Sequence, residues 1–382
     1  MRQQLSGDAS VLRRLNSAAI LRLLREAGVA TLSELASGAR VSRPTAEAIV
    51  EHLLAEGWAE ECGEEPGDRQ RGRPARRFGF RAASGHVMGV GIGASRLRAM
   101  VADLNGTIVA DRRAPGDPDM PAEDRLDAIA ELAAAVAGQA GLSFADIVAV
   151  GVGTTGTVDG AGRVVKSVAL SGWTGLDLRG ELGDRIGAMV LVDNDMRLAV
   201  LAEHWRGAAQ GRDDVIYLFT GDRIGMGLLI GGRPHRGAHA ASGEIGAQPY
   251  EHWNAFKHVM DYALAVEPGE LRSSRQSAEF AIARARSGDA KAGLAVRELA
   301  RGLAAGLITV VNPLDPDLVV IGGSLTSAGD LLVGPIREVF EEYCLYPPEV
   351  VASGLGSECI TLGAVRFALD HAERHLFSQG TF

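Results

Sequence analysis

From His86 onward the chain consists of short apolar runs that end in glycine or small polar residues, and this pattern limits that region to an α/β fold. Segments 87–92 and 98–104 have the length of strands joined by a tight turn, and segment 147–152 is a buried strand that leads into Gly153-Thr-Thr-Gly156. An alanine-rich helix is predicted over about residues 122–140. A β-meander followed by alternating helices and strands predicts the first half of an α/β domain.

A second half of similar order follows. Segment 189–192 is a predicted strand that ends at Asp193-Asn-Asp195, a helix is predicted over 196–209, and segment 215–220 opens the second half. Duplicated α/β halves that face a cleft are typical of the two-lobed actin-like ATPase (sugar kinase-like) fold. We expect this domain to span residues 81–382. Lobe 1 then covers about residues 81–200 plus a C-terminal helix over 363–382, and lobe 2 covers about 201–362.

The first 80 residues have a helical pattern instead. Apolar residues at helical spacing stop at Gly28, and Thr31-Leu-Ser-Glu34 is a capping box that predicts a short second helix. Ser42 and Pro44 are typical of the start of a third helix. Two strands follow, one beginning at Trp58 and one over 78–80. The order predicts a winged helix-turn-helix DNA-binding domain over residues 1–80.

Two groups of residues in this region are the candidate DNA contacts. The second helix of a helix-turn-helix places its N-terminal residues at the base edges of the major groove. Here these residues are Ser42, Arg43, Thr45 and Glu47. Five arginines lie between positions 69 and 77, where glycine allows close approach, proline keeps the chain extended and arginine suits a narrow minor groove. The residues expected there are Arg71, Gly72, Arg73, Pro74 and Arg76. The alternative is a three-helix domain that binds protein, with the arginines in a flexible linker.

The run from Asn16 to Arg77 resembles the DNA-binding module of the ROK-family repressors, bacterial regulators related to sugar kinases. Val41-Ser-Arg-Pro-Thr45 and Leu54-Ala-Glu-Gly57 match the recognition-helix pattern of that family, and Gly72-Arg73-Pro74 matches its linker. The resemblance continues over most of the chain, to Leu362-Gly-Ala-Val-Arg366, and is weakest from about residue 250 to 287.

Three stretches carry the resemblance on the ligand side. Asn194-Asp195 matches the family's E-N-D-A sequence, with Asp193 and Met196 replacing its first and last residues. Residues 242–246 resemble its A-G-E-I-G segment, and residues 312–324 its adenosine-side strand and loop. The resemblance implies that Asn194, Asp195 and Glu244 hold sugar hydroxyls, with Asp195 at the position of the kinase base. The alternative is a strand-end turn and a helix cap that bind no ligand.

Arginines near these stretches suggest a second ligand class. Arg197 and Arg223 suit the oxygens of a phosphorylated or otherwise anionic sugar. The simpler interpretation is that both arginines form surface ion pairs.

The departures from the family pattern argue against catalysis. Gly91 stands where the first phosphate loop of the kinases, D-x-G-G-T, has its aspartate. In the second loop Asp222 adds a negative charge near the phosphates, and Arg223 replaces a glycine. Both changes oppose phosphoryl transfer. Ala247 replaces the zinc-binding histidine, and no cysteine lies between Cys62 and Cys344, so we expect neither a metal nor a cofactor.

The remaining sequence features bear on location and partners. No run approaches the roughly 18 to 20 apolar residues of a membrane span, the N-terminus lacks a signal-peptide pattern, and the three cysteines are far apart. We therefore expect a cytoplasmic, non-enzymatic regulator, a repressor by resemblance. It would bind an inverted-repeat operator in double-stranded DNA as a dimer or larger homo-oligomer, and respond to a sugar or sugar phosphate between the lobes. The alternatives are an ATP-dependent sugar kinase with a DNA-binding head, or a regulator that only dimerises through this domain.

Overall fold

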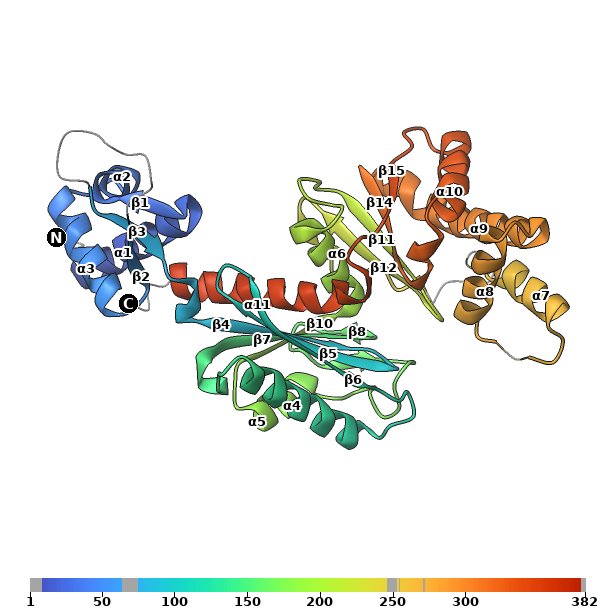
Figure 1. Cartoon of the computed structure of the whole chain (residues 1–382), viewed down its shortest axis with the longest axis horizontal. Helices are drawn as coiled ribbons and strands as arrows, with labels where there is room; N and C mark the ends of the chain where they lie inside the picture. Colours follow the sequence, from blue (N-terminus) through green and yellow to red (C-terminus); the bar gives the residue numbers. More distant parts are fainter. Residues whose placement is uncertain (1–8, 64–74, 246–252, 254, 271, 379–382) are drawn as a thin grey trace, which may run out of the picture.

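A computed structural model of the 382-residue chain describes residues 9–63, 75–245, 253, 255–270 and 272–378. These residues form an N-terminal head and a larger two-lobed domain, with helix α11 running between them (Figure 1). Arg71, Gly72, Arg73 and Pro74, which are predicted DNA contacts, lie outside the described residues. No described helix is both long and apolar enough to cross a membrane.

The head contains three helices and a small antiparallel sheet in which β3 is central. Its elements are α1 (Ala9–Ala27), β1 (Val29–Thr31), α2 (Leu32–Gly38), α3 (Arg43–Ala55), β2 (Ala59–Cys62) and β3 (Arg77–Phe80). The capping box forms as predicted, since Thr31 Oγ1 accepts from the backbone N–H of Glu34, and a carboxylate oxygen of Glu34 accepts from the backbone N–H of Thr31 at 2.7 Å. Leucines of α1 and α3 pack against Phe78 in the core.

Lobe 1 is a five-stranded sheet with strand order β10-β7-β4-β5-β6. Its strands are β4 (His86–Ile92), β5 (Arg96–Asp103), β6 (Ile108–Pro115), β7 (Ile147–Thr154) and β10 (Val190–Asn194). Helices α4 (Ala122–Gln139) and α5 (Leu178–Ile186) cover one face, and β8 (Thr157–Val158) and β9 (Val164–Lys166) form a hairpin beside it. The parallel β10-β7-β4 part and the antiparallel meander confirm the α/β expectation for this half.

Helix α11 (Cys359–Ser378) covers the other face of the lobe 1 sheet. Glycine in the central strands permits a close approach there: a Cβ atom at Gly89 would lie 2.5 Å from the carbonyl oxygen of Thr361. The apolar runs of the sequence therefore end in glycine partly because α11 packs directly on the strand backbone. The helix begins at Cys359, four residues before the expected start.

Lobe 2 has a second five-stranded sheet, in the order β13-β12-β11-β14-β15. The strands are β11 (Val215–Thr220), β12 (Ile224–Ile230), β13 (Arg233–Pro234), β14 (Leu318–Gly323) and β15 (Glu349–Ala352). One face packs against α9 (Ala290–Leu314) and α10 (Asp330–Tyr343), and α7 (Lys257–Val266) and α8 (Ser274–Arg286) lie against α9. Four short 3-10 helices complete the described elements: η1 (Ala82–Ser84), η2 (Phe144–Asp146), η5 (Ser324–Ala328) and η6 (Gly356–Glu358).

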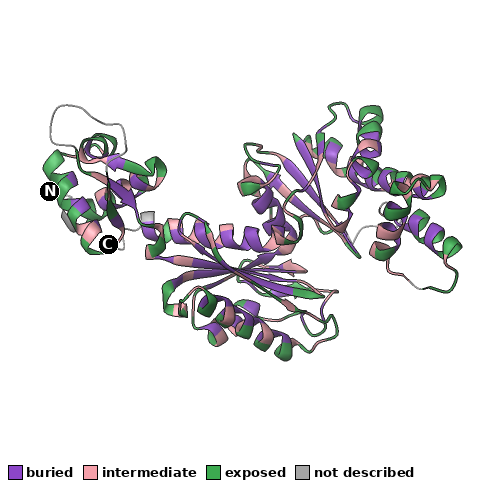
Figure 2. Cartoon of the chain, in the orientation of Figure 1, coloured by how far each residue is buried: buried purple, intermediate pink, exposed green. Residues whose placement is uncertain are grey.

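The other face of the lobe 2 sheet packs against α6 (Asp195–Arg206), which also packs against α11. The two lobes therefore meet through the α6–α11 pair, and buried side chains run along both sheets and α11 (Figure 2). Since α6 belongs with the second sheet, the lobes separate near Asp195, a few residues before the expected position 200.

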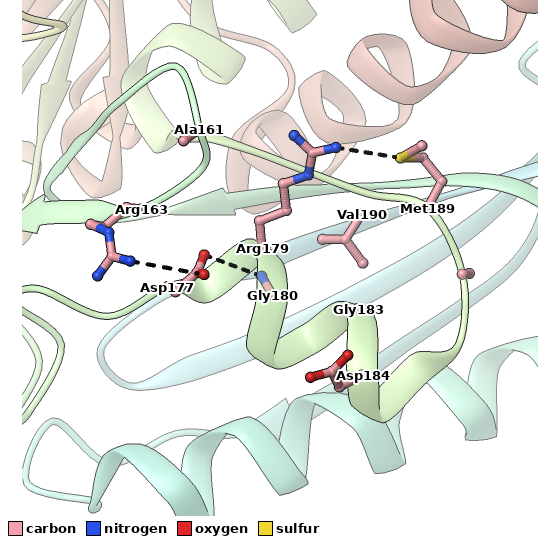
Figure 3. Close-up of a pocket in the computed structure, with 10 residues that line it drawn as sticks. Ala161, Arg163, Asp177, Arg179, Gly180, Gly183, Asp184, Met189 and Val190 are labelled. Carbon is pink, nitrogen blue, oxygen red and sulfur yellow. Dashed lines mark hydrogen bonds and ion pairs between the residues drawn. The ribbon is translucent and has the colours of Figure 1, made fainter.

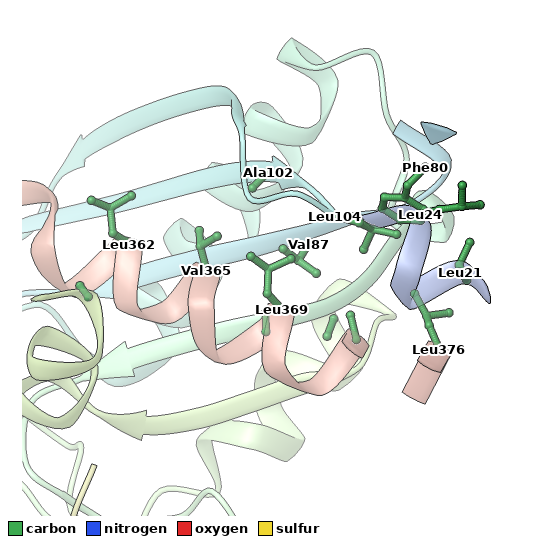
Figure 4. Packing of buried hydrophobic residues seen from close by; sticks show 14 of the residues in the cluster. Leu21, Leu24, Phe80, Val87, Ala102, Leu104, Leu362, Val365, Leu369 and Leu376 are labelled. Atoms are coloured by element: carbon green, nitrogen blue, oxygen red, sulfur yellow. The ribbon is translucent and has the colours of Figure 1, made fainter. Parts of the chain in front are cut away.

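The hydrophobic core continues from lobe 1 into the head (Figure 4). Leu21 and Leu24 of α1 lie near Leu376 at the end of α11, in the same cluster as Val87 of β4 and Leu369 of α11. Burial of each such large side chain stabilises the folded state by about 1.5–3 kcal/mol. The head is thus packed onto the C-terminal part of α11.

Candidate functional site

The N-terminal turn of α3 holds four of the predicted DNA contacts, and all four are exposed. Ser42 is the N-cap: its Oγ accepts from the backbone N–H of Thr45 at 3.3 Å and lies 2.7 Å from Thr45 Oγ1. These two hydroxyls therefore fix the start of the helix. Arg43 and Glu47 project from the same turns with their charged groups at the surface.

Arg76, at the end of the arginine-rich segment, binds two carboxylates of the head. It donates to Glu61 of β2 at 2.9 and 3.0 Å and to Glu51 of α3 at 2.8 Å. These bonds lower the pKa of Glu61 and raise that of Arg76. The structure thus places Arg76 against α3 as an ion-pair partner, which the sequence pattern did not indicate.

The second candidate site lies where β10 ends and α6 begins. Asn194 is the N-cap of α6, and its Oδ1 accepts from the backbone N–H groups of Met196 at 2.9 Å and Arg197 at 3.2 Å. Its Nδ2 donates to the carbonyl oxygen of Gly156 at 2.9 Å. Both ends of this buried amide are engaged within the fold, so Asn194 positions the residue that follows it.

Asp195 is the first residue of α6 and is partly exposed. The pKa of its carboxyl group is raised to about 7, mainly by burial and also by the negative charge of Glu244, while a hydrogen bond from the Met196 N–H opposes the shift. A carboxyl group with a pKa near neutrality can accept a proton from, or hydrogen-bond, a sugar hydroxyl.

Glu244 approaches the same region from lobe 2, in the segment that follows β13. Its carboxyl group remains exposed, but the surrounding protein raises its pKa, against the positive charges of Arg197 and Lys166. Asp195 opens α6 at the boundary between the lobes, and Glu244 follows β13 of lobe 2, so the two carboxyl groups lie near enough to each other to interact electrostatically.

Arg197 organises the segments around these carboxyl groups. It is 1% exposed and donates from Nε to Asp193 at 2.5 Å, from Nη1 to the Ala240 carbonyl at 2.9 Å and from Nη2 to the Val158 carbonyl at 3.1 Å. The interpretation of Arg197 as a surface ion pair is therefore wrong, because the pair is buried. Its donors are directed to the protein, which leaves the guanidinium poorly placed for an anionic ligand.

Asp193 is a positioning residue that the sequence comparison treated only as a departure from the family pattern. Its carboxylate, 6% exposed, accepts from Arg197, from Arg236 at 2.9 Å and from the backbone N–H of Asn194 at 2.7 Å. The Arg236 contact links the end of β10 to the segment that carries Glu244. In the sequence, the four-residue spacing of Asp193 and Arg197 was the one feature that could have indicated an ion pair between them.

Both loops that correspond by resemblance to the phosphate loops of the kinases carry other residues. A Cβ atom at Gly91 would lie 2.7 Å from Oγ1 of the buried Thr361 in α11. Arg98 pairs with Gly91 across the strands and donates to Asp111 and Glu358, each at 2.6 Å. This strand end is occupied by α11 and an ion-pair cluster.

In the second loop, Asp222 accepts from the backbone N–H and Nε of Arg275, at 3.3 and 3.2 Å. Although burial opposes the change, bonds from Ser273 and Arg275 lower the pKa of Asp222. Its negative charge is therefore retained beside the loop. Arg223 is exposed and donates to the Val168 carbonyl at 2.9 Å, so no ion pair is needed to account for its position.

A cavity of about 530 Å³ lies between α5 and the start of β10, at the opposite end of that strand from Asp195 (Figure 3). Two of its charged groups form an ion pair, with Arg163 3.9 Å from Asp177, and Arg179 lies 3.8 Å from Met189 Sδ. Within the described ranges no three His, Cys, Asp or Glu side chains converge as metal ligands. Ala247 lies outside those ranges.

Some known proteins resemble only the two-lobed domain of this chain, and others resemble the head as well. The sequence profile of the ROK family matches residues 87–370. A glucokinase from Streptomyces coelicolor is 29% identical over 318 residues, covering 74% of this chain and 98% of that protein. A xylose repressor from Bacillus subtilis is 22% identical over 348 residues, covering 87% of this chain and 88% of that repressor.

A solved structure described as a ROK family transcriptional regulator, a homolog of the E. coli MLC protein, superposes over 97% of this chain and 99% of its own. The TM-score is 0.74 at 20% sequence identity, a likeness that shows the fold. Together with the profile match, it confirms the α/β, sugar kinase-like fold expected for the two lobes and the stated family resemblance.

Proposed function

This chain belongs to the ROK family, and from that membership we propose that it is a DNA-binding transcriptional regulator, a repressor of carbohydrate-related genes that acts in the cytoplasm. Its relatives include a glucokinase and a xylose repressor, so family membership alone leaves two functions open. The glucokinase is matched almost completely by three quarters of this chain, which leaves about a quarter of the chain beyond the kinase. The three-helix head with its small sheet supports the regulator, because this arrangement is typical of a winged helix-turn-helix.

The observation that carries the proposal is the position of α11. Its first turns lie on Gly91 at the former phosphate side, its middle packs against α6, and its last turns contact the head. Movement of the lobes can therefore reach the DNA-binding surface through one continuous helix. A kinase that acts only on a small molecule has no need of this connection.

The residues at the two loops that match the kinase phosphate loops support the same proposal. Catalysis requires a carboxylate that positions the metal ion at the first loop, and Gly91 supplies none. Thr361 Oγ1 also fills the space that a side chain at Gly91 would need, and Asp222 keeps a negative charge at the second loop. The chain therefore retains the sugar side of the site and lacks the phosphate side.

The effector in this proposal is a sugar or a sugar derivative bound between the lobes. Asp195 and Glu244 accept hydrogen bonds from its hydroxyl groups, while Asn194 and Asp193 position them. Two adjacent carboxyl groups favour a hydroxyl-rich ligand over an anion at this point. A phosphorylated sugar could bind only with its phosphate directed away from them.

Effector binding would act on DNA through the α6–α11 contact. The two helices are so close that a Cβ atom at Gly363 of α11 would overlap the carbonyl oxygen of Leu198 in α6. A shift of α6 on ligand binding must therefore displace α11 and the head. In a homodimer this changes the spacing of the two recognition helices, which must match half-sites about one helical turn apart. The coupling lowers DNA affinity if the bound state favours the wrong spacing.

Selection of bound genomic fragments by the purified chain, with and without a panel of sugars and sugar phosphates, tests the proposal. The expected result is an inverted repeat whose occupancy falls when one sugar is added. Failure to enrich any sequence would contradict the DNA-binding assignment. Enrichment that no ligand changes would instead favour a regulator that uses the second domain only for dimerisation. Thermal shift with the same panel separates these cases, because a ligand specific to the folded state raises the Tm.

One observation favours the kinase as a second candidate. Asp195 remains at the position of the family's base with a pKa near 7, which suits proton transfer. ATP turnover measured with each sugar of the panel tests this candidate. We expect no turnover above that of an Asp195→Asn control.

A further inference from the structure

The exposed stripe of the recognition helix carries charges of both signs. Arg43, Glu47 and Glu51 follow one another at intervals of four residues, so they lie on one face of α3. Within the described ranges Glu51 is neutralised by Arg76, whereas Arg43 and Glu47 form no ion pair or side-chain hydrogen bond. Arg43 and Glu47 are therefore the two charged groups of this stripe that remain available to a partner.

An unneutralised glutamate is unfavourable on a surface that binds a polyanion, because the phosphates repel it. The repulsion is offset only where the carboxylate meets hydrogen-bond donors. In the major groove these donors are the exocyclic amino groups of cytosine and adenine. Adenine also presents its N7 acceptor beside the amino group, and this acceptor repels a carboxylate, whereas cytosine presents the donor alone. A glutamate at this position therefore favours cytosine.

Resting on the DNA-binding function proposed above, we propose that Glu47 is a specificity-determining residue that selects cytosine in each operator half-site, with Arg43 selecting a nearby guanine. Arginine binds guanine O6 and N7 with two parallel hydrogen bonds. Four residues of helix rise by about 6 Å, which is roughly two base pairs. The half-site is then expected to contain a cytosine and a guanine about two base pairs apart, on either strand.

The Glu47→Gln variant tests this assignment with little risk to the fold, since residue 47 is exposed and glutamine is a good helix former. Glutamine presents a donor and an acceptor together, which match the N6 and N7 groups of adenine. Selection from a randomised duplex library by the full-length protein should therefore change the preferred base at one position of each half-site from cytosine to adenine. The expected change in relative preference is about tenfold.

Glu26→Gln is the matched control, because it removes the same charge from an exposed position of the head on α1. It should select the same sequence as the native chain. If the native chain selects an inverted repeat and Glu47→Gln selects an identical one, the inference is overturned while DNA binding stands. If the native chain selects no sequence, the proposed function fails and the inference fails with it.

Discussion

Arg25 of the head donates to Glu373 of α11, with Nη2 2.7 Å from Oε1, so one ion pair joins the head to the helix that packs between the two lobe sheets. Both side chains are largely shielded, with exposures of 21% and 28%. Although burial opposes the shift, the bonds from Arg25 and Arg366 lower the pKa of Glu373. The orientation of the head therefore depends on α11.

Replacing Arg25 with alanine should weaken the response to the effector more than it weakens DNA binding. The apolar contacts of Leu21 and Leu24 would still hold the head, but its orientation on α11 would be less restricted. The loss of stability should be about 1 kcal/mol. The measurement is operator affinity with and without the effector. Arg22→Ala, at an exposed position of the same helix, is the control and should keep the native affinity ratio. An unchanged ratio in Arg25→Ala would contradict the role of this contact.

Gly91→Asp should destabilise the protein and should not restore phosphoryl transfer. The new Cβ would lie 2.7 Å from Thr361 Oγ1, and overpacking of this kind costs about 1–3 kcal/mol. A lower Tm and no ATP turnover are expected. Adding Thr361→Ala should recover part of the lost stability, because it removes the opposing atom. If Gly91→Asp alone has the native Tm, the strand end has free space and α11 does not fill it.

The pKa of about 7 at Asp195 predicts a pH dependence of stability. The folded-state pKa lies above the ordinary value of 3.8, so between about pH 4 and 7 the folded state binds a proton that the unfolded state does not. Asp195 therefore lowers stability most above pH 7, and this cost disappears as the pH falls toward 4. Asp195→Asn should be more stable than the native chain by an amount on the order of 1–3 kcal/mol at pH 8.

Melting curves at pH 5 and pH 8 measure this difference. The advantage of Asp195→Asn should shrink at pH 5, where the native carboxyl group is largely protonated. Asp184→Asn, at an exposed position of α5, should show no such dependence. Equal gains at both pH values would show that the substitution stabilises the site for another reason.

The local features of the fold were accessible from the sequence. The capping box at Thr31 and the N-cap at Ser42 depend on residues three positions apart, and both form. The glycine-ended apolar runs became the central strands of the two sheets, because they combine burial with close approach of a helix. Asp195 and Glu244 lie near enough to interact electrostatically, and their role as ligand contacts stays a prediction.

The features that the sequence concealed join distant segments. The Arg25–Glu373 pair spans 348 positions, and the Arg98–Glu358 pair spans 260. Arginine is usually found at the surface, but Arg197 is buried because the carbonyl groups of Ala240 and Val158, in two distant segments, accept its hydrogen bonds. No periodicity or motif records which far segment supplies a partner, so these contacts follow only from the packed structure.

The role of Arg76 can be separated from direct phosphate contact by a double-mutant cycle. Arg76→Ala leaves the carboxylates of Glu51 and Glu61 uncompensated at α3, the proposed recognition helix, so affinity for all DNA sequences should fall, by about three- to tenfold at low salt. If Arg76 acts by neutralising these groups, adding Glu51→Ala should restore much of the affinity, because one source of repulsion is removed. If Arg76 binds a phosphate instead, Glu51→Ala should give no rescue, and the slope of log affinity against log salt should fall by about one in Arg76→Ala. Titrations of the four proteins at several salt concentrations distinguish the two roles.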